Sequence, residues 1–209
     1  MARNTAARFV HDVGLAAWFG GSLMGAVGLN GAAHDVKDAT DRRRVASRGW
    51  ARWAPVNAVA IGAHLLAGTQ LVRGNRGRLV GQRGVGAASA VKTALTGVGL
   101  AMTAYSGYLG KRVSEAGDVP AEGGTRPSAA TPDSTARDMQ LLRGLQWAIP
   151  AVTGGILLVN ALMGEQQRPG EVARAALART GKAAKAAAAN PSATAKAVTT
   201  AARQASHRG

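Results

Sequence analysis

The chain has 209 residues, of which 46% are hydrophobic but only 4% aromatic, so a soluble core would depend on Ala, Val and Leu. It contains no cysteine, which excludes a disulfide scaffold, thiolate-bound zinc, iron–sulfur clusters and cysteine nucleophiles. The 26 Lys and Arg residues outnumber the 11 Asp and Glu residues, and the formal net charge of +15 indicates an anionic partner, either nucleic acid or an acidic lipid surface.

Four long stretches of the chain carry no Asp, Glu, Lys or Arg, which is an uneven distribution for such a charged protein. Each stretch is about as long as the ~20-residue helix that a bilayer requires. The sequence therefore predicts an all-α protein, a four-transmembrane-helix bundle over residues 9–164. The spans are expected at about 10–33, 53–72, 86–110 and 144–164.

The first segments of the chain are a basic stretch at 1–8 and the span at 10–33, whose uncharged part, Val13–His34, is longer than the apolar core of a signal peptide. A polar stretch at 35–52 is expected to be a short exposed connection. The second span begins with Trp53 and Pro55, residues typical of a membrane interface and of a first helical turn. The third span contains Lys92. The Pro-, Gly- and Ser-rich composition of 111–143 predicts a flexible loop before the fourth span.

The segment 165–209 is a basic, Ala- and Lys-rich tail, which we expect to be partly disordered. At 100° per residue, four of its cations share one face of a helix that would end before Pro191. Such a face suits anionic lipid headgroups, and nucleic acid is a weaker alternative because the tail has no aromatic residues for stacking. The four cations are Arg174, Arg179, Lys182 and Lys185.

An even number of spans places both termini on one side of the membrane. More Lys and Arg residues flank that side than the other, which favours a cytoplasmic location for both termini. The sequence thus predicts a multi-pass protein of the cell membrane.

Small residues recur every fourth position in two of the spans, at Ala17, Gly21 and Gly25 in the first and at Gly99, Thr103 and Gly107 in the third. Faces of this kind allow helix backbones to approach closely. They predict close helix packing, and they leave a homo-oligomer open.

Polar side chains at membrane depth are expensive unless they are paired or in contact with water. Counted at ~1.5 Å per residue from the ends of the spans, five such residues fall in the same half of the bundle. One interpretation is a functional site in which Asp12 pairs with Lys92, and His11 or His64 binds a metal or haem iron or relays a proton. The five residues are His11, Asp12, His64, Lys92 and Asn160.

The other interpretation is structural. Lys92 would extend to the headgroups, His11 and Asp12 would lie at the interface, and His64 would bond a backbone carbonyl. The estimated depths of His11 and His64 differ by ~6–8 Å, which argues against one iron shared by both imidazoles.

One local pattern resembles a known family. His11, six further residues, and then Trp18, Phe19, Gly20 and Gly21 resemble the first-helix H-x6-W-x-G-G signature of the CopD copper-resistance proteins and the HemJ-type protoporphyrinogen oxidases. Lys92 resembles the lysine that these families carry in their third helix. The resemblance implies a four-helix membrane bundle with a copper- or haem-related role.

The sequence contains no other catalytic motif, so it predicts a small integral membrane protein rather than an enzyme of a defined class. Its polar cluster would handle copper, haem or protons. The alternative is a non-enzymatic membrane anchor whose basic tail binds anionic lipid or nucleic acid.

Overall fold

The computed structural model describes residues 4–74 and 85–165, together with Lys185 and Ala189. Met1–Ala161 forms one compact unit and Leu162–Gly209 belongs to a second. The described chain is mostly helical. Its elements in order are α1 (Thr5–Met24), the π-helical turn η1 (Gly25–Leu29), α2 (Asn30–His34), α3 (Ala39–Gly74), α5 (Val85–Glu115), β1 (Ala121–Gly123), β2 (Arg126–Pro127) and α6 (Asp133–Glu165).

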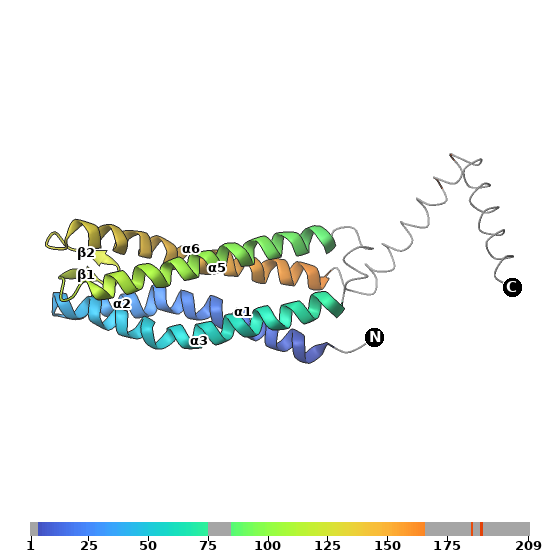
Figure 1. The fold of residues 1–209 in the computed structure, drawn as a ribbon, viewed down its shortest axis with the longest axis horizontal. Helices are drawn as coiled ribbons and strands as arrows, with labels where there is room; N and C mark the ends of the chain where they lie inside the picture. Colours follow the sequence, from blue (N-terminus) through green and yellow to red (C-terminus); the bar gives the residue numbers. More distant parts are fainter. Residues whose placement is uncertain (1–3, 75–84, 166–184, 186–188, 190–209) are drawn as a thin grey trace. The chain divides into compact units, whose positions relative to one another are not determined.

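The helices run side by side, and each long segment runs opposite to the one before it (Figure 1). α1, η1 and α2 form one continuous segment, so there are four long segments in all. The strands β1 and β2 form a short antiparallel hairpin between α5 and α6. This hairpin lies at the end where α2 connects to α3, and we call it the hairpin end (Figure 1).

Three of the described helical segments are long and apolar enough to cross a membrane, namely Thr5–His34, Ala39–Gly74 and Asp133–Glu165. Three of the four predicted spans lie within these segments, which indicates a membrane protein. The remaining span, 86–110, lies in α5, a helix of 31 residues that is not among these three segments.

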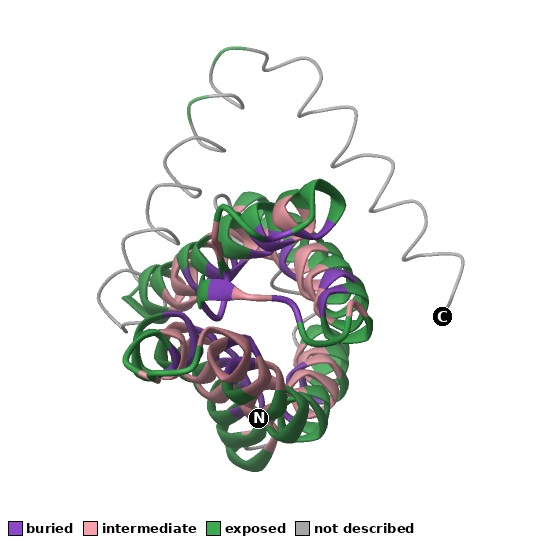
Figure 2. Ribbon diagram, turned by 90° about the vertical axis from the view of Figure 1, so that its left-hand side faces the viewer, coloured by how far each residue is buried: buried purple, intermediate pink, exposed green. Residues whose placement is uncertain are grey.

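Large apolar side chains are exposed on the outer surface of the helices, and the interior contains polar groups beside its apolar residues. Viewed along the helices, the outward faces are mostly exposed and the inward faces are buried (Figure 2). The side chains of Val59, Leu66 and Phe9 are 73%, 72% and 67% exposed. In contrast, buried polar side chains include His11, Ser22, Arg43, His64, Gln146 and Thr153.

All four helical segments extend beyond the predicted spans. The stretch 35–52 was expected to be a connection, but most of it is the first part of α3 and places Pro55 inside the helix. The loop predicted at 111–143 was too long, since α5 continues to Glu115, α6 begins at Asp133, and the hairpin lies between them. The basic segment 1–8 likewise overlaps α1, which begins at Thr5. Polar residues form the ends of these helices, because a helix can continue past its apolar stretch into polar sequence.

The start of α3 is defined by Asp38, whose carboxylate accepts hydrogen bonds from the backbone nitrogens of Thr40 at 2.8 Å and Asp41 at 3.0 Å. This satisfies two of the amide groups that a helix leaves unpaired at its start. The hydrogen bond from the Thr40 hydroxyl, followed by those from the two amides, lowers the pKa of Asp38 below its usual 3.8. The sequence analysis did not identify this cap.

Glycines on α1 allow it to pack closely on α3. A Cβ at Gly14 would lie 2.5 Å from the carbonyl oxygen of Ala60, so the two backbones are in contact there. Gly21 and Gly25 lie under the rings of Trp53 and Trp50. The predicted small-residue face of the first span is therefore a packing surface.

The apolar core joins all four segments. Its buried residues are Leu15 and Trp18 of α1 and Ile149 and Ile156 of α6, and side chains such as Ile61 of α3 and Leu95 of α5 pack against them. A smaller cluster of Val113, Ala121 and Met139 fixes the hairpin to α5 and α6.

Candidate functional site

The centre of the candidate site is His11, whose side chain is almost fully buried beneath α3 and α5. Its Nδ1 lies 2.8 Å from a carboxylate oxygen of Asp12, and its Nε2 lies 2.8 Å from Nζ of Lys92. One interpretation of the sequence paired Asp12 with Lys92, and in the structure the imidazole of His11 bonds both. We refer to Asp12, His11, Lys92 and His64 as the His11 cluster.

The partners of His11 define its protonation pattern. The Lys92 ammonium has only donors, so the Nε2 atom of His11 accepts, and the Nδ1–H group donates to the Asp12 carboxylate. The negative charge of the exposed Asp12 carboxylate balances the Lys92 ammonium, and this reduces the cost of placing the ammonium between apolar helices. The structural interpretation, in which Lys92 would extend to the headgroups, differs from the structure, where Lys92 bonds His11.

His64 lies directly against His11, with the ring centroids 4.1 Å apart and the planes inclined by 37°. Its Nδ1–H donates to the backbone carbonyl of His11 at 3.0 Å, as the structural interpretation of the sequence expected for a backbone carbonyl. The sequence-based estimate that His11 and His64 lie at different depths was wrong, because their rings are in contact. Those estimates used the ends of the predicted spans, whereas α3 continues to Gly74, beside Asn4 at the start of α1.

The Trp18 position of the H-x6-W-x-G-G pattern is fully buried and connects three helices. Its indole N–H donates to the Thr103 hydroxyl of α5 at 3.1 Å, and its ring meets that of His64 edge to face, with centroids 6.5 Å apart. Of the two glycines that follow, Gly21 is required for packing against α3, whereas a side chain at Gly20 would meet nothing within 4 Å.

Asn160, the fifth predicted member, does not join this network. Its side-chain nitrogen is buried and has no hydrogen-bond partner among the residues that the structure describes. The predicted lipid-facing cations Arg174, Arg179 and Lys182 lie outside the described residues, and Lys185 is helical and exposed.

The geometry of the His11 cluster does not fit a metal or haem iron held by His11 and His64. Two imidazoles that share an ion have nitrogens about 2 Å from it, which puts the ring centroids about 5 to 6 Å apart, whereas these are at 4.1 Å. Both nitrogens of His11 are also engaged by Asp12 and Lys92. Within residues 4–74 and 85–165, no three His, Asp or Glu side chains form a metal-binding group.

A second polar network lies toward the hairpin end and was not identified from the sequence. The Asn30 amide donates to Gln146 at 2.6 Å and accepts from the Trp50 indole N–H at 3.2 Å. The buried Arg43 side chain donates to the carbonyl oxygen of Val113 at 2.7 Å. Asn30 and Gln146 are amides within uncharged stretches, and this is the signal that could have revealed them.

No protein-family model matches the chain, and no curated protein and no solved structure is similar to it. The arrangement of the His11 cluster is therefore the main basis for a functional proposal.

Proposed function

We propose that the protein is an integral membrane protein whose four helical segments all cross the bilayer as a four-helix bundle. Support comes from three apolar segments and from the exposed apolar side chains that cover them. α5 would be the fourth span. It is 31 residues long, and its one charge between Val85 and Gly110 is Lys92, which bonds His11.

Membrane insertion can be tested by alkaline carbonate extraction of membranes that contain the full chain. The protein should remain in the pellet and be released only by detergent, because the apolar faces would otherwise be exposed to water. Release by carbonate alone would contradict the proposal.

We further propose that the His11 cluster holds and transfers a proton, and the observation that carries this is the double engagement of His11 by Asp12 and Lys92. A proton moving from Nζ of Lys92 to Nε2 of His11 leaves a neutral amine and an imidazolium that the Asp12 carboxylate stabilises. The total charge of the cluster does not change in this step. The Asp12 side chain is 54% exposed, so one end of the chain of groups reaches the surface of the helical unit.

The proton proposal predicts proton flux in liposomes that contain the purified protein and an internal pH-sensitive dye. A membrane potential imposed with potassium and valinomycin should drive a flux above that of empty liposomes. His11→Gln should abolish this flux, because an amide cannot take up and release a proton. His34→Gln is the matched control, since His34 is exposed at the hairpin end. A flux equal in the two variants, or equal to that of empty liposomes, would contradict the proposal.

The resemblance to the CopD and HemJ-type proteins remains a prediction. It is consistent with the contacts of His11, Trp18 and Lys92, which the structure brings into one region. The tilted contact of the His11 and His64 imidazoles, with centroids 4.1 Å apart, does not support copper or haem iron bound between them.

A second proposal concerns the tail, which carries eight Lys and Arg residues after Gly164. Each cation near an anionic leaflet contributes about 1 kcal/mol, so the tail would lie on such a surface. In nanodiscs that contain phosphatidylglycerol, trypsin should cut the tail more slowly than in phosphatidylcholine nanodiscs. Equal rates in the two lipids would contradict this role.

A further inference from the structure

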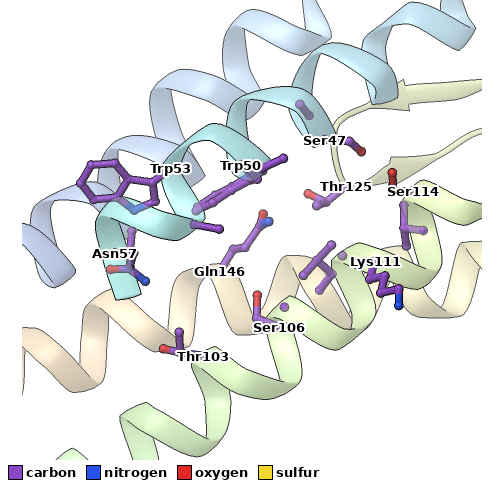
Figure 3. Close-up of a pocket in the computed structure, with 18 of the residues that line it drawn as sticks. Ser47, Trp50, Trp53, Asn57, Thr103, Ser106, Lys111, Ser114, Thr125 and Gln146 are labelled. Carbon is purple, nitrogen blue, oxygen red and sulfur yellow. The ribbon is translucent and has the colours of Figure 1, made fainter. Parts of the chain in front are cut away.

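A cavity of about 590 Å³ lies in the half of the helical unit nearer the hairpin end. Its walls come mainly from α3, α5 and α6, whose side chains extend into a common space (Figure 3). On α5 the lining residues extend from Thr103 to Glu115, which is about 18 Å along the helix at ~1.5 Å per residue. The cavity is therefore long, and its two ends lie in different parts of the bundle.

The outer end of the cavity is polar and open. Lys111 and Glu115 line it there, and their side chains are 75% and 63% exposed. Both residues lie beyond Gly110, where the predicted third span ends. At the inner end the lining residues are Ile61 and Thr103, which belong to the predicted second and third spans. In a bundle that crosses the bilayer, the cavity leads from the aqueous side into the apolar layer.

Neutral polar side chains line the cavity along its whole length. Ser106 and Gln146 extend from α5 and α6 toward Trp50 of α3 (Figure 3). A side chain at Gly107 or Gly110 would meet no atom within 4 Å, so these glycines leave space beside the polar groups. The alcohols and amides of the wall are those of Ser22, Ser47, Asn57, Thr103, Ser106, Ser114, Thr125 and Gln146.

Three of these polar groups have no hydrogen-bond partner in the described part of the chain, yet keep accessible surface. They are the hydroxyls of Ser47 and Ser106 and the amide nitrogen of Asn57. Water can donate to or accept from each of them, whereas a lipid acyl chain would leave all three unpaired, which is costly. At ~30 Å³ per molecule in the liquid, the cavity has room for about 20 water molecules.

The inner end of the cavity is connected to the His11 cluster through Trp18. Thr103 lines the cavity and accepts a hydrogen bond from the Trp18 indole N–H at 3.1 Å. The ring of Trp18 in turn meets the His64 ring, with centroids 6.5 Å apart. The indole is fully buried, so it closes the cavity toward His64.

We propose that this cavity is a water-filled vestibule through which the His11 cluster exchanges protons with the aqueous phase at the hairpin end. The exposed Asp12 carboxylate is the other end of the same route. Because Trp18 closes the vestibule, each exchange requires this indole to move. The role in proton exchange rests on the proton transfer proposed above, whereas the hydration of the cavity does not.

Hydration is tested by the reactivity of single cysteines, since the chain has no cysteine of its own. Each variant in nanodiscs is treated with MTSET, a cationic reagent that does not enter lipid, and modification is followed by mass spectrometry. Ser106→Cys and Asn57→Cys place a thiol in the cavity wall of α5 and of α3. Both thiols should react, because water in the cavity allows them to ionise.

The matched controls are Ala104→Cys and Val59→Cys. Each lies two residues from its partner variant, about 200° around the same helix, and is exposed without lining the cavity. These thiols face lipid and should react about tenfold more slowly or less. All four variants should react once unfolded in SDS, which shows that the thiols are intact. If Ser106→Cys and Asn57→Cys react no faster than their controls, the cavity is not hydrated and the proposal is overturned.

The role in proton exchange is tested by blocking the cavity. Ser106→Cys protein is modified with MTSET before reconstitution, and its proton flux is measured in the liposome assay described above. The flux should fall about fivefold or more relative to the unmodified variant, because the attached cation displaces water and repels protons. Dithiothreitol removes the group and should restore the flux. Ala104→Cys treated in the same way is the control and should show no change.

The outcomes separate this proposal from the one on which it rests. A flux that is present in Ser106→Cys and unchanged by modification would overturn the vestibule and leave proton transfer by the His11 cluster intact. Absence of flux from the unaltered chain would overturn proton transfer and with it this role of the cavity, and the reactivity of the cysteines would still decide whether the cavity contains water.

Discussion

Around His11 the buried polar side chains bond one another, whereas the residues around Asn57 line a cavity of about 590 Å³. The difference follows from what each helix contributes. At Gly14 the backbone of α1 touches α3, which brings His11 against His64 and leaves no space between them. Nearer the hairpin end, the indoles of Trp53 and Trp50 pack on Gly21 and Gly25, and the small residues Ser106, Gly107 and Gly110 of α5 line a space that no side chain fills. Close helix packing therefore pairs the polar groups around His11, and small residues on α5 leave a cavity nearer the hairpin end.

The largest effect is expected from removing His11, which would disrupt the hydrogen bonds of the His11 cluster. His11→Leu leaves the Lys92 ammonium and the Asp12 carboxylate without the group that connects them, and should lower the free energy of unfolding by about 3 kcal/mol. Denaturant unfolding in detergent micelles measures this. The double variant His11→Leu/Lys92→Met should recover part of the loss, since it also removes the unpaired charge of Lys92. Equal loss in single and double variants would contradict the pairing.

The next effect concerns the close approach of α1 and α3. Gly14→Ala places a methyl group against the Ala60 carbonyl and should cost about 2 kcal/mol, because backbone cannot move aside as a side chain can. Gly20→Ala on the same helix should instead stabilise the protein by about 0.5 kcal/mol, since alanine favours helix and nothing lies nearby. Thermal unfolding of the two variants tests this. Equal shifts would show that the helices do not touch at Gly14.

A smaller effect is expected where the two regions meet, at the hydrogen bond between Trp18 and Thr103. Thr103→Val should cost about 1 to 2 kcal/mol, because the buried indole N–H loses its acceptor. Thr93→Val is the control, since Thr93 is exposed and its hydroxyl bonds a carbonyl one turn earlier in its own helix. Denaturant unfolding should show a larger loss of stability for Thr103→Val than for Thr93→Val. Equal losses would contradict the hydrogen bond between Trp18 and Thr103.

The smallest effect is expected outside both regions, at Asp38. Because its pKa is lowered in the folded protein, its stabilising contribution is complete above its usual pKa and is lost as the pH falls through the lowered value. Asp38→Ala should therefore lower the melting temperature at pH 7 and have less effect at pH 2.5. If the melting temperatures of the variant and the unchanged protein differ by the same amount at pH 7 and pH 2.5, the Asp38 cap is not the cause.

Much of the helical organisation could be predicted, because long uncharged stretches require the internal hydrogen bonding of a helix in an apolar environment. The helix ends could not, since the polar residues that extend α3 and α6 resemble those of a connection. The hairpin was also missed: its strands are Ala121–Gly123 and Arg126–Pro127, too short for a periodic signal.

The candidate site was predicted in part. Counting residues from the span ends placed His11, Asp12, His64 and Lys92 in one half of the bundle, and the structure brings these four together. Counting could not show that the His11 imidazole separates Asp12 from Lys92, because this depends on how each helix is rotated about its axis. It also grouped Asn160 with them, although the buried side-chain nitrogen of Asn160 has no hydrogen-bond partner among the described residues.

By itself the amino-acid sequence determined where the long apolar helical stretches lie and which polar residues they contain, because hydrophobicity and length are properties of each segment alone. Tertiary structure decided which of those polar groups bond and which surround a cavity. That choice depends on the distance between helices, and the distance depends on whether a glycine of one helix meets backbone or indole on its neighbour, as at Gly14 and Gly21.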